Sequence, residues 1–268
     1  MISWYVRGME KTLKIIYDFG MNNGDDVAYY LTKADLVVAV EANTALCKGA
    51  ECRFADEIAA GRLVILNVAL SEKTSDVAQP FYVHRANHVL SQLRRPAPED
   101  LHLFDEVLVP QMTADSITDR FGEPHYVKID IEGCDEVVLK SFLNSGTFPD
   151  FISAECHSAE VFCLICAMGY RSFNLVDGAT VEKYGFSAHS AGPYGADILS
   201  PWYDLQSFFY LLAWERLGWK DIHASKVIEC QVTAPPSRTM GPSEHLRDFV
   251  PSLKRAIRLR LAKSGGKV

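Results

Sequence analysis

The sequence has no apolar stretch long enough to cross a membrane and no excess of positive charge. Its hydrophobic runs all fall short of the roughly 20 residues that a membrane-spanning helix needs. The 268 residues include 27 Lys and Arg against 34 Asp and Glu, which gives a formal net charge of −7. Binding to a nucleic-acid backbone depends on a broad positive surface that displaces counterions. We therefore expect no nucleic-acid partner and no transmembrane segment.

The chain also lacks the features of an exported, disulfide-bonded protein. Its N-terminus does not show the charged-then-apolar order of a signal peptide. The seven cysteines are an odd number, and their spacing is not that of a small disulfide framework. We therefore predict reduced thiols and a cytoplasmic location. Cys163 and Cys166 lie on an apolar helical segment, where core packing is favoured over a zinc site with Cys156 and His157.

What the sequence does contain is a regular alternation of strand and helix patterns. Hydrophobic residues make up 48% of the chain and charged residues 23%, which is enough for a full core. Stretches rich in apolar residues predict buried strands at 14–19, 36–41, 63–70, 126–131, 150–157 and 169–177, with a possible last strand at 226–232. Helical patterns at 25–33 and 44–60 separate the first three strands. This alternation predicts an α/β fold with a doubly wound parallel sheet.

One domain is predicted for residues 1–232, followed by a linker and a basic amphipathic helix in 233–268. The regular alternation breaks at 71–112, which we interpret as an inserted hairpin or loop over the ligand pocket. Its basic residues at 84–95 could orient an anionic or sugar-like acceptor, although such charges are more often simply solvated. Residues 187–197 are rich in small residues and turns, and 204–217 have the pattern of an aromatic-rich helix. The segment 186–224 as a whole is predicted to form a substrate-side loop. The C-terminal helix could dock on its own domain or pair in a homo-oligomer.

The first predicted strand ends in a glycine-rich turn, Asp18 to Gly24, which then opens a helix. A unit of this kind builds a pocket at the carboxyl end of a parallel strand. Gly20 and Gly24 allow the backbone to adopt positive φ or to lie close to a ligand. Glu41 ends the second strand, where an acid can accept both hydroxyls of a ribose. An adenosine-containing ligand is predicted, and Asn22 in place of a fingerprint glycine favours S-adenosylmethionine over NAD.

Two later strands end in ionisable residues that we expect at the same edge of the sheet. Asp130 and Glu132 are two positions apart, so their side chains point to one side of the strand. Glu155 and His157 end the next strand in the same way. Carboxylates gathered in one place need donors or a cation, which a sulfonium and ammonium group or a divalent metal would supply. The group has the composition of an acid/base site.

The order and spacing of these motifs resemble those of FkbM-type methyltransferases, a family of class I S-adenosylmethionine-dependent enzymes. The resemblance covers roughly residues 14–175 and is carried by the motifs at 17–24, 40–43, 67–71, 113–117, 127–133 and 153–157. The motif at 127–133, with its Lys, Asp, Glu and Gly, is the most specific. The family usually has alanine where Met21 stands and proline where Ala42 stands. Neither departure removes a polar group from the expected cofactor site.

The resemblance implies a Rossmann-like, seven-stranded class I methyltransferase sheet with helices on both faces. It implies S-adenosylmethionine as cofactor and methyl transfer to a hydroxyl, commonly on a sugar or a polyketide-like natural product. The implied cofactor-binding residues are Asp18, Gly20, Asn22, Gly24, Glu41, Asn43, Ser71 and Asp130. The candidate catalytic residues are His157, Asp130, Glu132 and Glu155. No metal ligand is assigned, and a divalent metal that acidifies the acceptor hydroxyl stays open as an option.

Two other functions stay open at this point. An NAD-dependent oxidoreductase is supported only by the glycine turn and Glu41, since Asp25 stands near the position of the third fingerprint glycine. No tyrosine–lysine catalytic pair is evident either. A non-catalytic S-adenosylmethionine-binding module would keep the same fold but would have no need for an acid-rich rim. The expected partner is a small-molecule or glycan acceptor.

Overall fold

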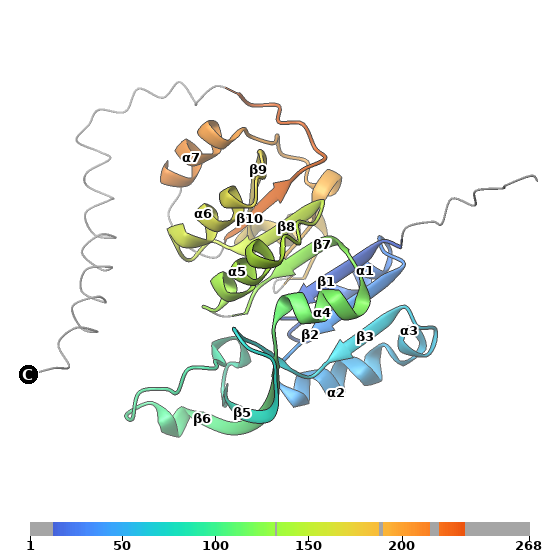
Figure 1. Ribbon diagram of the computed structural model, residues 1–268, viewed down its shortest axis with the longest axis vertical. Coiled ribbons are helices and arrows are strands. Elements are labelled where there is room, and N and C mark those ends of the chain that lie inside the picture. Colours follow the sequence, from blue (N-terminus) through green and yellow to red (C-terminus); the bar gives the residue numbers. More distant parts are fainter. Residues whose placement is uncertain (1–12, 132, 188–189, 215–219, 234–268) are drawn as a thin grey trace, which may run out of the picture. The chain divides into compact units, whose positions relative to one another are not determined.

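A central sheet of seven strands, in the order β3-β2-β1-β7-β8-β10-β9, organises the protein (Figure 1). The computed structural model describes residues 13–131, 133–187, 190–214 and 220–233. The strands of this sheet are β1 (Ile15–Phe19), β2 (Leu36–Val40), β3 (Leu63–Leu66), β7 (Pro124–Ile129), β8 (Phe151–Glu155), β9 (Ser172–Asp177) and β10 (Lys220–Ser225). β10 pairs antiparallel with both of its neighbours, β8 and β9, and the other pairings in this sheet are parallel. The predicted seven-stranded α/β fold is confirmed.

Helices cover both faces of the sheet, because its strands are apolar on both sides. The helices are α1 (Val27–Leu31), α2 (Thr44–Arg53), α3 (Ala55–Ala59), α4 (Ala114–Phe121), α5 (Asp135–Ser145), α6 (Ala159–Ala167) and α7 (Leu205–Trp214). On one face Tyr17 and Phe19 of β1 share a core with Phe142 of α5. On the other face Ile16 shares a core with Tyr30 of α1. Successive residues of one strand therefore build two separate cores.

The insert predicted at 71–112 contains most of a second, three-stranded sheet in the order β4-β6-β5. Its strands are β4 (Ala69–Leu70), β5 (Ser75–His84) and β6 (Phe104–Met112), and the short helices η1 (His88–Leu90) and η2 (Leu101–Leu103) lie between β5 and β6. Ala69, Phe81 and Val109 form its small core. The single strand predicted at 63–70 is thus divided between two sheets. The break occurs where the side chain of Asn67 donates to the carbonyl oxygens of Glu41 and Ala42.

Two other predicted boundaries are wrong. The helix predicted at 44–60 is interrupted at Phe54, which ends α2 and precedes α3. The last strand was predicted at 226–232, but β10 occupies Lys220–Ser225. This segment alternates polar and apolar residues, yet Ile222 and His223 are both buried because β10 lies inside the sheet. Apart from residue 233, the predicted linker and basic C-terminal helix lie outside the described residues.

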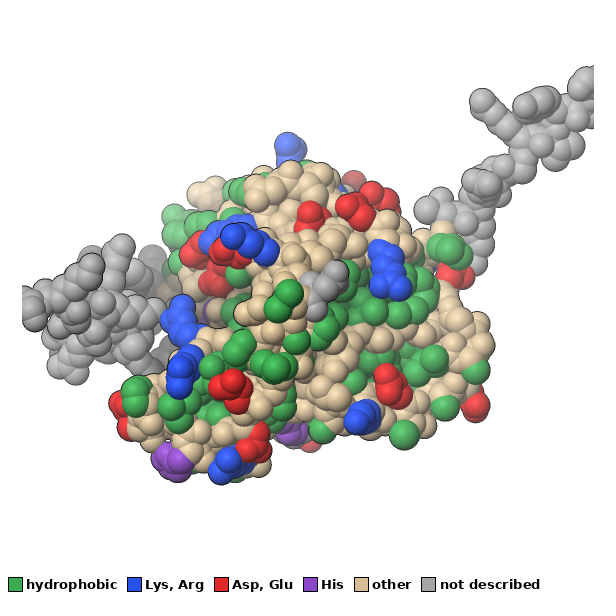
Figure 2. Space-filling model, turned by 60° about the horizontal axis from the view of Figure 1, so that its bottom comes forward, with side chains coloured by type: hydrophobic (Ala, Val, Ile, Leu, Met, Phe, Trp, Pro, Cys, Tyr) green, Lys and Arg blue, Asp and Glu red, His purple; other side chains and the backbone are tan. Residues whose placement is uncertain are grey.

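The described surface carries charges of both signs. Figure 2 shows acidic, basic and hydrophobic side chains interspersed on one face, where the basic side chains do not join into one continuous patch. None of the described helices is long and apolar enough to cross a membrane.

Candidate functional site

A cavity of about 380 Å³ lies at the carboxyl edge of the central sheet. The glycine turn after β1, the end of β2 and the ends of β7 and β8 form one side of it, through Gly20, Asn22, Val40, Glu41, Ala42, Asp130, Ile131 and Glu155. The second sheet and the insert form the other side, through Ala69 and Leu70 of β4, Phe81 of β5 and residues 88–93. Residues from both sheets therefore enclose one space of a size typical for small-ligand sites.

The glycine turn lies directly against the end of β7. Gly20 has φ +87°, and a Cβ at this position would lie 1.8 Å from the carbonyl oxygen of Asp130. Only glycine fits here, because both the conformation and the contact exclude a side chain. Asn22 also has positive φ, at 54°, and its Oδ1 is buried without a hydrogen-bond partner among the described residues. The turn therefore holds an unsatisfied acceptor in a residue that lines the cavity.

Glu41 is held in place by two backbone groups. The N–H of Asn22 donates to Oε2 at 2.9 Å, and the N–H of Asn43 donates to Oε1 at 2.7 Å. Asn43 in turn caps α2, where its side chain accepts from the N–H of Ala45. Burial raises the pKa of Glu41 to about 7, and the two N–H donors only partly oppose this effect. The carboxylate faces the cavity with one lone pair of each oxygen still free.

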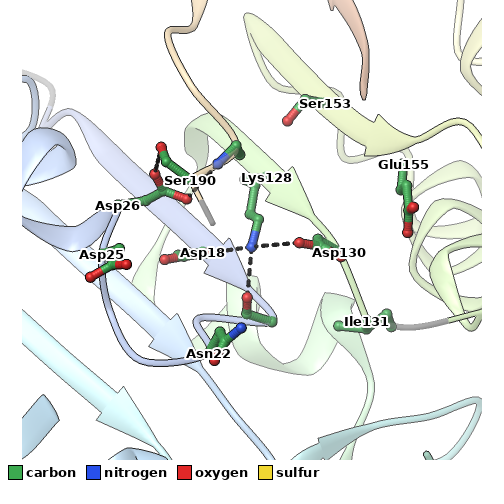
Figure 3. Close-up of polar contacts among 12 residues, drawn as sticks. Asp18, Asn22, Asp25, Asp26, Lys128, Asp130, Ile131, Ser153, Glu155 and Ser190 are labelled. Carbon is green, nitrogen blue, oxygen red and sulfur yellow. Dashed lines mark hydrogen bonds and ion pairs between the residues drawn. The ribbon is translucent and has the colours of Figure 1, made fainter. Parts of the chain in front are cut away.

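Lys128 lies between two acids and the glycine turn (Figure 3). Its Nζ donates to the carbonyl oxygen of Gly20 at 2.6 Å, and it lies 3.4 Å from Asp18 Oδ1 and 3.3 Å from Asp130 Oδ2. Burial alone would lower the pKa of Lys128, but the carboxylates of Asp130, Asp18, Asp26 and Asp221 outweigh it and hold this pKa well above its usual value. Asp18 is fully buried, and burial raises its pKa to about 6. Lys128 thus links β1 and β7 to the glycine turn.

A second group, which we call the Asp135–Glu155–His157 cluster, lies beside the cavity. His157 Nδ1 is 3.5 Å from Glu155 Oε2 and 3.7 Å from Asp135 Oδ2. Contact with Glu155 and the charge of Asp135 raise the pKa of His157 to about 9, against the effect of burial. Burial raises the pKa of Asp135 to about 7. With this pKa the imidazole is protonated at neutral pH, and it must lose that proton before His157 can act as a general base.

The structure brings together some of the predicted site residues and separates others. Gly20, Asn22, Glu41, Asp130 and Glu155 line the cavity, and His157 contacts Glu155. The predicted residues that do not line it are Asp18, Gly24, Asn43 and Ser71. Glu132 lies outside the described residues.

Each of these non-lining residues has a structural role within the protein, and that of Asn43 is to cap α2. Asp18 faces Lys128, and the position of a Cβ on Gly24 would be 3.1 Å from the ring of Phe54. Ser71 donates to the carbonyl oxygen of Lys73 within the insert. Their predicted cofactor contacts stay predictions.

The segment 186–224, predicted as a substrate-side loop, contributes no described residue to the cavity lining. It packs behind the glycine turn instead, because the buried carboxylate of Asp26 accepts from Ser190 Oγ and from the N–H of Ala191 (Figure 3). Tyr194 of this segment stacks on Tyr126 of β7, with ring centroids 4.0 Å apart. The segment also contains α7, which lies within the helix predicted at 204–217, and most of β10.

Two acids near the site did not stand out in the sequence. Asp135 begins α5, where an acid is an ordinary helix-start residue, and only the fold shows that it is fully buried beside His157. Asp221 pairs in register with Glu155, because the antiparallel β10 begins at the carboxyl edge. Burial and the charge of Asp130 raise the pKa of Asp221 well above its usual value. A prediction of the last strand at 220–225 would have placed Asp221 at the carboxyl edge of the sheet.

The cysteines do not form the zinc site considered for 156–166. Cys156 is buried, Cys163 is exposed and Cys166 is intermediate. Within the described residues, the group of ionisable side chains that is close enough to share a metal ion joins His157 to Asp135 and Glu155.

Comparison with known proteins identifies the family. Residues 18–171, more than half of the chain, match the model of the methyltransferase FkbM domain. A search of curated proteins finds no match.

Several solved structures are similar. A methyltransferase FkbM from Methylobacillus flagellatus KT shares 17% identity over 65% of this chain and 43% of its own, with a TM-score of 0.41. The chain thus spans less than half the length of that protein. A predicted O-methyltransferase from Agrobacterium tumefaciens shares 18% identity over 88% of each chain, with a TM-score of 0.33. An rRNA methylase from Streptococcus thermophilus shares 10% identity over 80% of this chain and 87% of its own, with a TM-score of 0.38.

Proposed function

Since the chain belongs to the FkbM methyltransferase family, we propose that it transfers a methyl group from S-adenosylmethionine to a hydroxyl of a sugar, a glycan or a related natural product. The observation that carries this proposal is the make-up of the cavity wall. A carboxylate suited to a ribose, Glu41, and two acids at the strand ends, Asp130 and Glu155, border the same space. Glu41 and Asp130 suit the binding of a nucleoside cofactor, and Glu155 suits the removal of a proton from the acceptor.

The residues around the glycine turn fit an adenosine carrying an amino-acid tail. Glu41 has a free lone pair on each oxygen, which suits the two hydroxyls of a ribose. Asp130 exposes 38% of its side chain at the cavity, where it would face the ammonium group of the tail. The unpaired Oδ1 of Asn22 would accept a hydrogen bond from the cofactor. Bound S-adenosylmethionine would supply an electrophilic methyl group.

The acceptor side of the site must remove a proton from a weakly acidic hydroxyl. We assign this task to the Asp135–Glu155–His157 cluster, since Glu155 reaches the cavity lining. The insert adds an aromatic ring, Phe81, and the polar side chains of His88 and Gln92 to the opposite wall. An aromatic face together with hydrogen-bonding groups suits a sugar-like acceptor. None of the described side chains of α7 contributes to this lining.

A product assay tests the proposed reaction. The full chain is incubated with S-adenosylmethionine carrying a deuterated methyl group and with a panel of sugars and hydroxylated natural products. We expect the label on an oxygen of one acceptor class, and Glu155→Gln should lower the rate about 100-fold, as for loss of an acid/base group. Glu160→Gln, on the exposed side of α6, is the control and should leave the rate unchanged. Label on nitrogen or carbon, or cofactor binding without transfer to any hydroxyl, would overturn the proposal.

The raised pKa of Glu41, about 7, predicts a pH-dependent cofactor affinity. The ionised carboxylate accepts hydrogen bonds from two hydroxyls more strongly than the protonated form. The Kd for S-adenosylmethionine should therefore rise about tenfold as the pH falls from about 8.5 to about 5.5, measured by calorimetry. The charge of Lys128 lowers this pKa, and the charge of Asp18 raises it.

The Glu41→Gln variant should bind S-adenosylmethionine weakly at every pH. Glu51→Gln is the matched control, because Glu51 lies exposed on α2 and the substitution changes the net charge equally. A wild-type affinity that does not change with pH, or equal affinities of the two variants, would show that Glu41 does not bind the cofactor.

A further inference from the structure

The Asp135–Glu155–His157 cluster has the composition of a metal site. Asp135 comes from the start of α5, Glu155 from the end of β8, and His157 from the short segment before α6. One ligand atom from each of the three side chains lies within 4.8 Å of the other two. Two carboxylate oxygens and one imidazole nitrogen therefore converge on a single point beside the cavity.

The distances within the cluster are too long for strong hydrogen bonds. A charged imidazole and a carboxylate that bond directly lie about 2.7–2.9 Å apart. His157 Nδ1 is instead 3.5 Å from Glu155 Oε2 and 3.7 Å from Asp135 Oδ2. Ligands about 2.1 Å from a tetrahedral ion are about 3.4 Å from one another. The two distances from His157 thus suit ligands around a shared ion better than direct hydrogen bonds.

The buried carboxylate of Asp135 provides an independent observation. Its side chain is fully buried, and the N–H of Ile131 holds Oδ1 at 2.9 Å. This contact directs Oδ2 toward His157, where it has no hydrogen-bond partner among the described residues. A buried carboxylate oxygen without a donor is unfavourable unless a cation satisfies it.

No lysine or arginine compensates these acids within the described part of the chain. Asp135 and Glu155 form ion pairs only with His157 there. Lys128, the cation buried nearby, is already engaged by Asp18, Asp130 and the carbonyl oxygen of Gly20. Asp221, in register with Glu155, adds a further acid beside the cluster.

We propose that Asp135, Glu155 and His157 bind one divalent first-row transition metal ion that coordinates the acceptor hydroxyl. An imidazole combined with two carboxylates suits Mn²⁺ or Zn²⁺ better than Mg²⁺ or Ca²⁺. Three protein ligands leave coordination positions open, and Glu155 places them at the cavity. The metal would lower the pKa of the coordinated hydroxyl, whose proton then passes to solvent water. The cluster would thus carry out the proton removal proposed above through the bound ion, without accepting the proton itself. The role of this ion in the reaction rests on the proposed O-methyl transfer; its binding does not.

Metal binding is tested first without cofactor or acceptor. The full chain is stripped with a chelator, dialysed and titrated with MnCl₂ and separately with ZnCl₂ by calorimetry, with the Mn²⁺ spectrum as a second readout. We expect one equivalent to bind, and at least a tenfold weaker affinity in Glu155→Gln and in His157→Ala. Glu155 is only partly buried, so its variant should fold even where changes at the buried Asp135 do not.

The matched control is His125→Ala. His125 Nδ1 lies 2.9 Å from Asp150 Oδ2, a directly bonded histidine–carboxylate pair outside the cavity lining, and its loss should leave metal affinity unchanged. No binding to the wild-type chain, or equal affinities in all variants, would overturn the site. Methyl transfer at full rate in the stripped protein would overturn its role in the reaction. S-adenosylmethionine binding to the stripped protein tests the proposed function separately, because the cofactor residues are not part of the cluster.

Discussion

Replacing Lys128 with methionine should destabilise the protein by about 3–5 kcal/mol at neutral pH, the range found when one partner of a buried ion pair is removed. Lys128 is 4% exposed, and its amino group is the cation in contact with the fully buried Asp18. Methionine preserves most of the side-chain volume, so the loss reports the charge and the hydrogen bond to Gly20. Urea unfolding followed by circular dichroism measures the effect.

The pH dependence of this variant separates charge from packing. Burial already raises the pKa of Asp18 to about 6 with Lys128 present, and removal of the cation raises it further. A carboxyl with a raised folded-state pKa contributes its stability below its unfolded pKa and loses it as the pH rises through the folded value. The difference in stability between wild type and Lys128→Met should therefore grow as the pH rises from about 5 to about 8. A difference independent of pH would assign the loss to packing alone.

The matched control is Lys140→Met on α5. Lys140 Nζ lies 2.6 Å from Glu160 Oε1, a shorter distance than those from Lys128 Nζ to Asp18 and Asp130. The side chains of Lys140 and Glu160 are, however, about half exposed. An exposed pair of this kind contributes at most about 1 kcal/mol. Equal losses in Lys128→Met and Lys140→Met would contradict the role assigned to the buried lysine.

The second large effect is expected for Gly20→Ala. The new Cβ would overlap the carbonyl oxygen of Asp130, and the backbone there has φ +87°. The conformational strain and the forced separation of β1 from β7 together should destabilise the protein by at least about 3 kcal/mol. We also expect loss of S-adenosylmethionine binding, because the turn lines the cavity. Urea unfolding and calorimetry measure the two effects.

Two other glycines separate the causes. Gly146 has φ +78° but nothing within 4 Å of a Cβ, so Gly146→Ala tests the conformation alone and should cost about 1–2 kcal/mol. Gly49 lies within α2 with neither constraint, and alanine there should stabilise the protein by about 0.5–1 kcal/mol. If Gly20→Ala lowers the free energy of unfolding no more than Gly146→Ala does, the close approach of Gly20 to Asp130 does not constrain residue 20 in solution.

The parallel part of the fold could be predicted because its strands are buried on both faces. Such strands are continuous apolar runs, as in β2, and they alternate with helices along the chain. The antiparallel β10 escaped the same reasoning, since Asp221 and His223 alternate with its apolar residues. Their burial results from the neighbours β8 and β9, which no local pattern reveals.

The candidate site could be predicted only where its residues end parallel strands. Asp130 and Glu155 meet at one edge because β7 and β8 pair in parallel. Asp135 could not be predicted, because its burial depends on how α5 packs against the segment after β8. Asp18 was expected to contact the ligand, but it stands one residue before the end of β1, in register with Lys128. Side chains of successive strand residues point to opposite faces, and this one faces its neighbour's lysine.

The central claim is that the cavity beside Gly20 and Glu41 binds S-adenosylmethionine. Calorimetric titration of the full chain with S-adenosylmethionine, and in parallel with NAD, tests it most directly. We predict one site for S-adenosylmethionine, with a Kd on the order of micromolar, and no measurable heat with NAD. Binding of NAD, or no binding of either compound, would contradict the account.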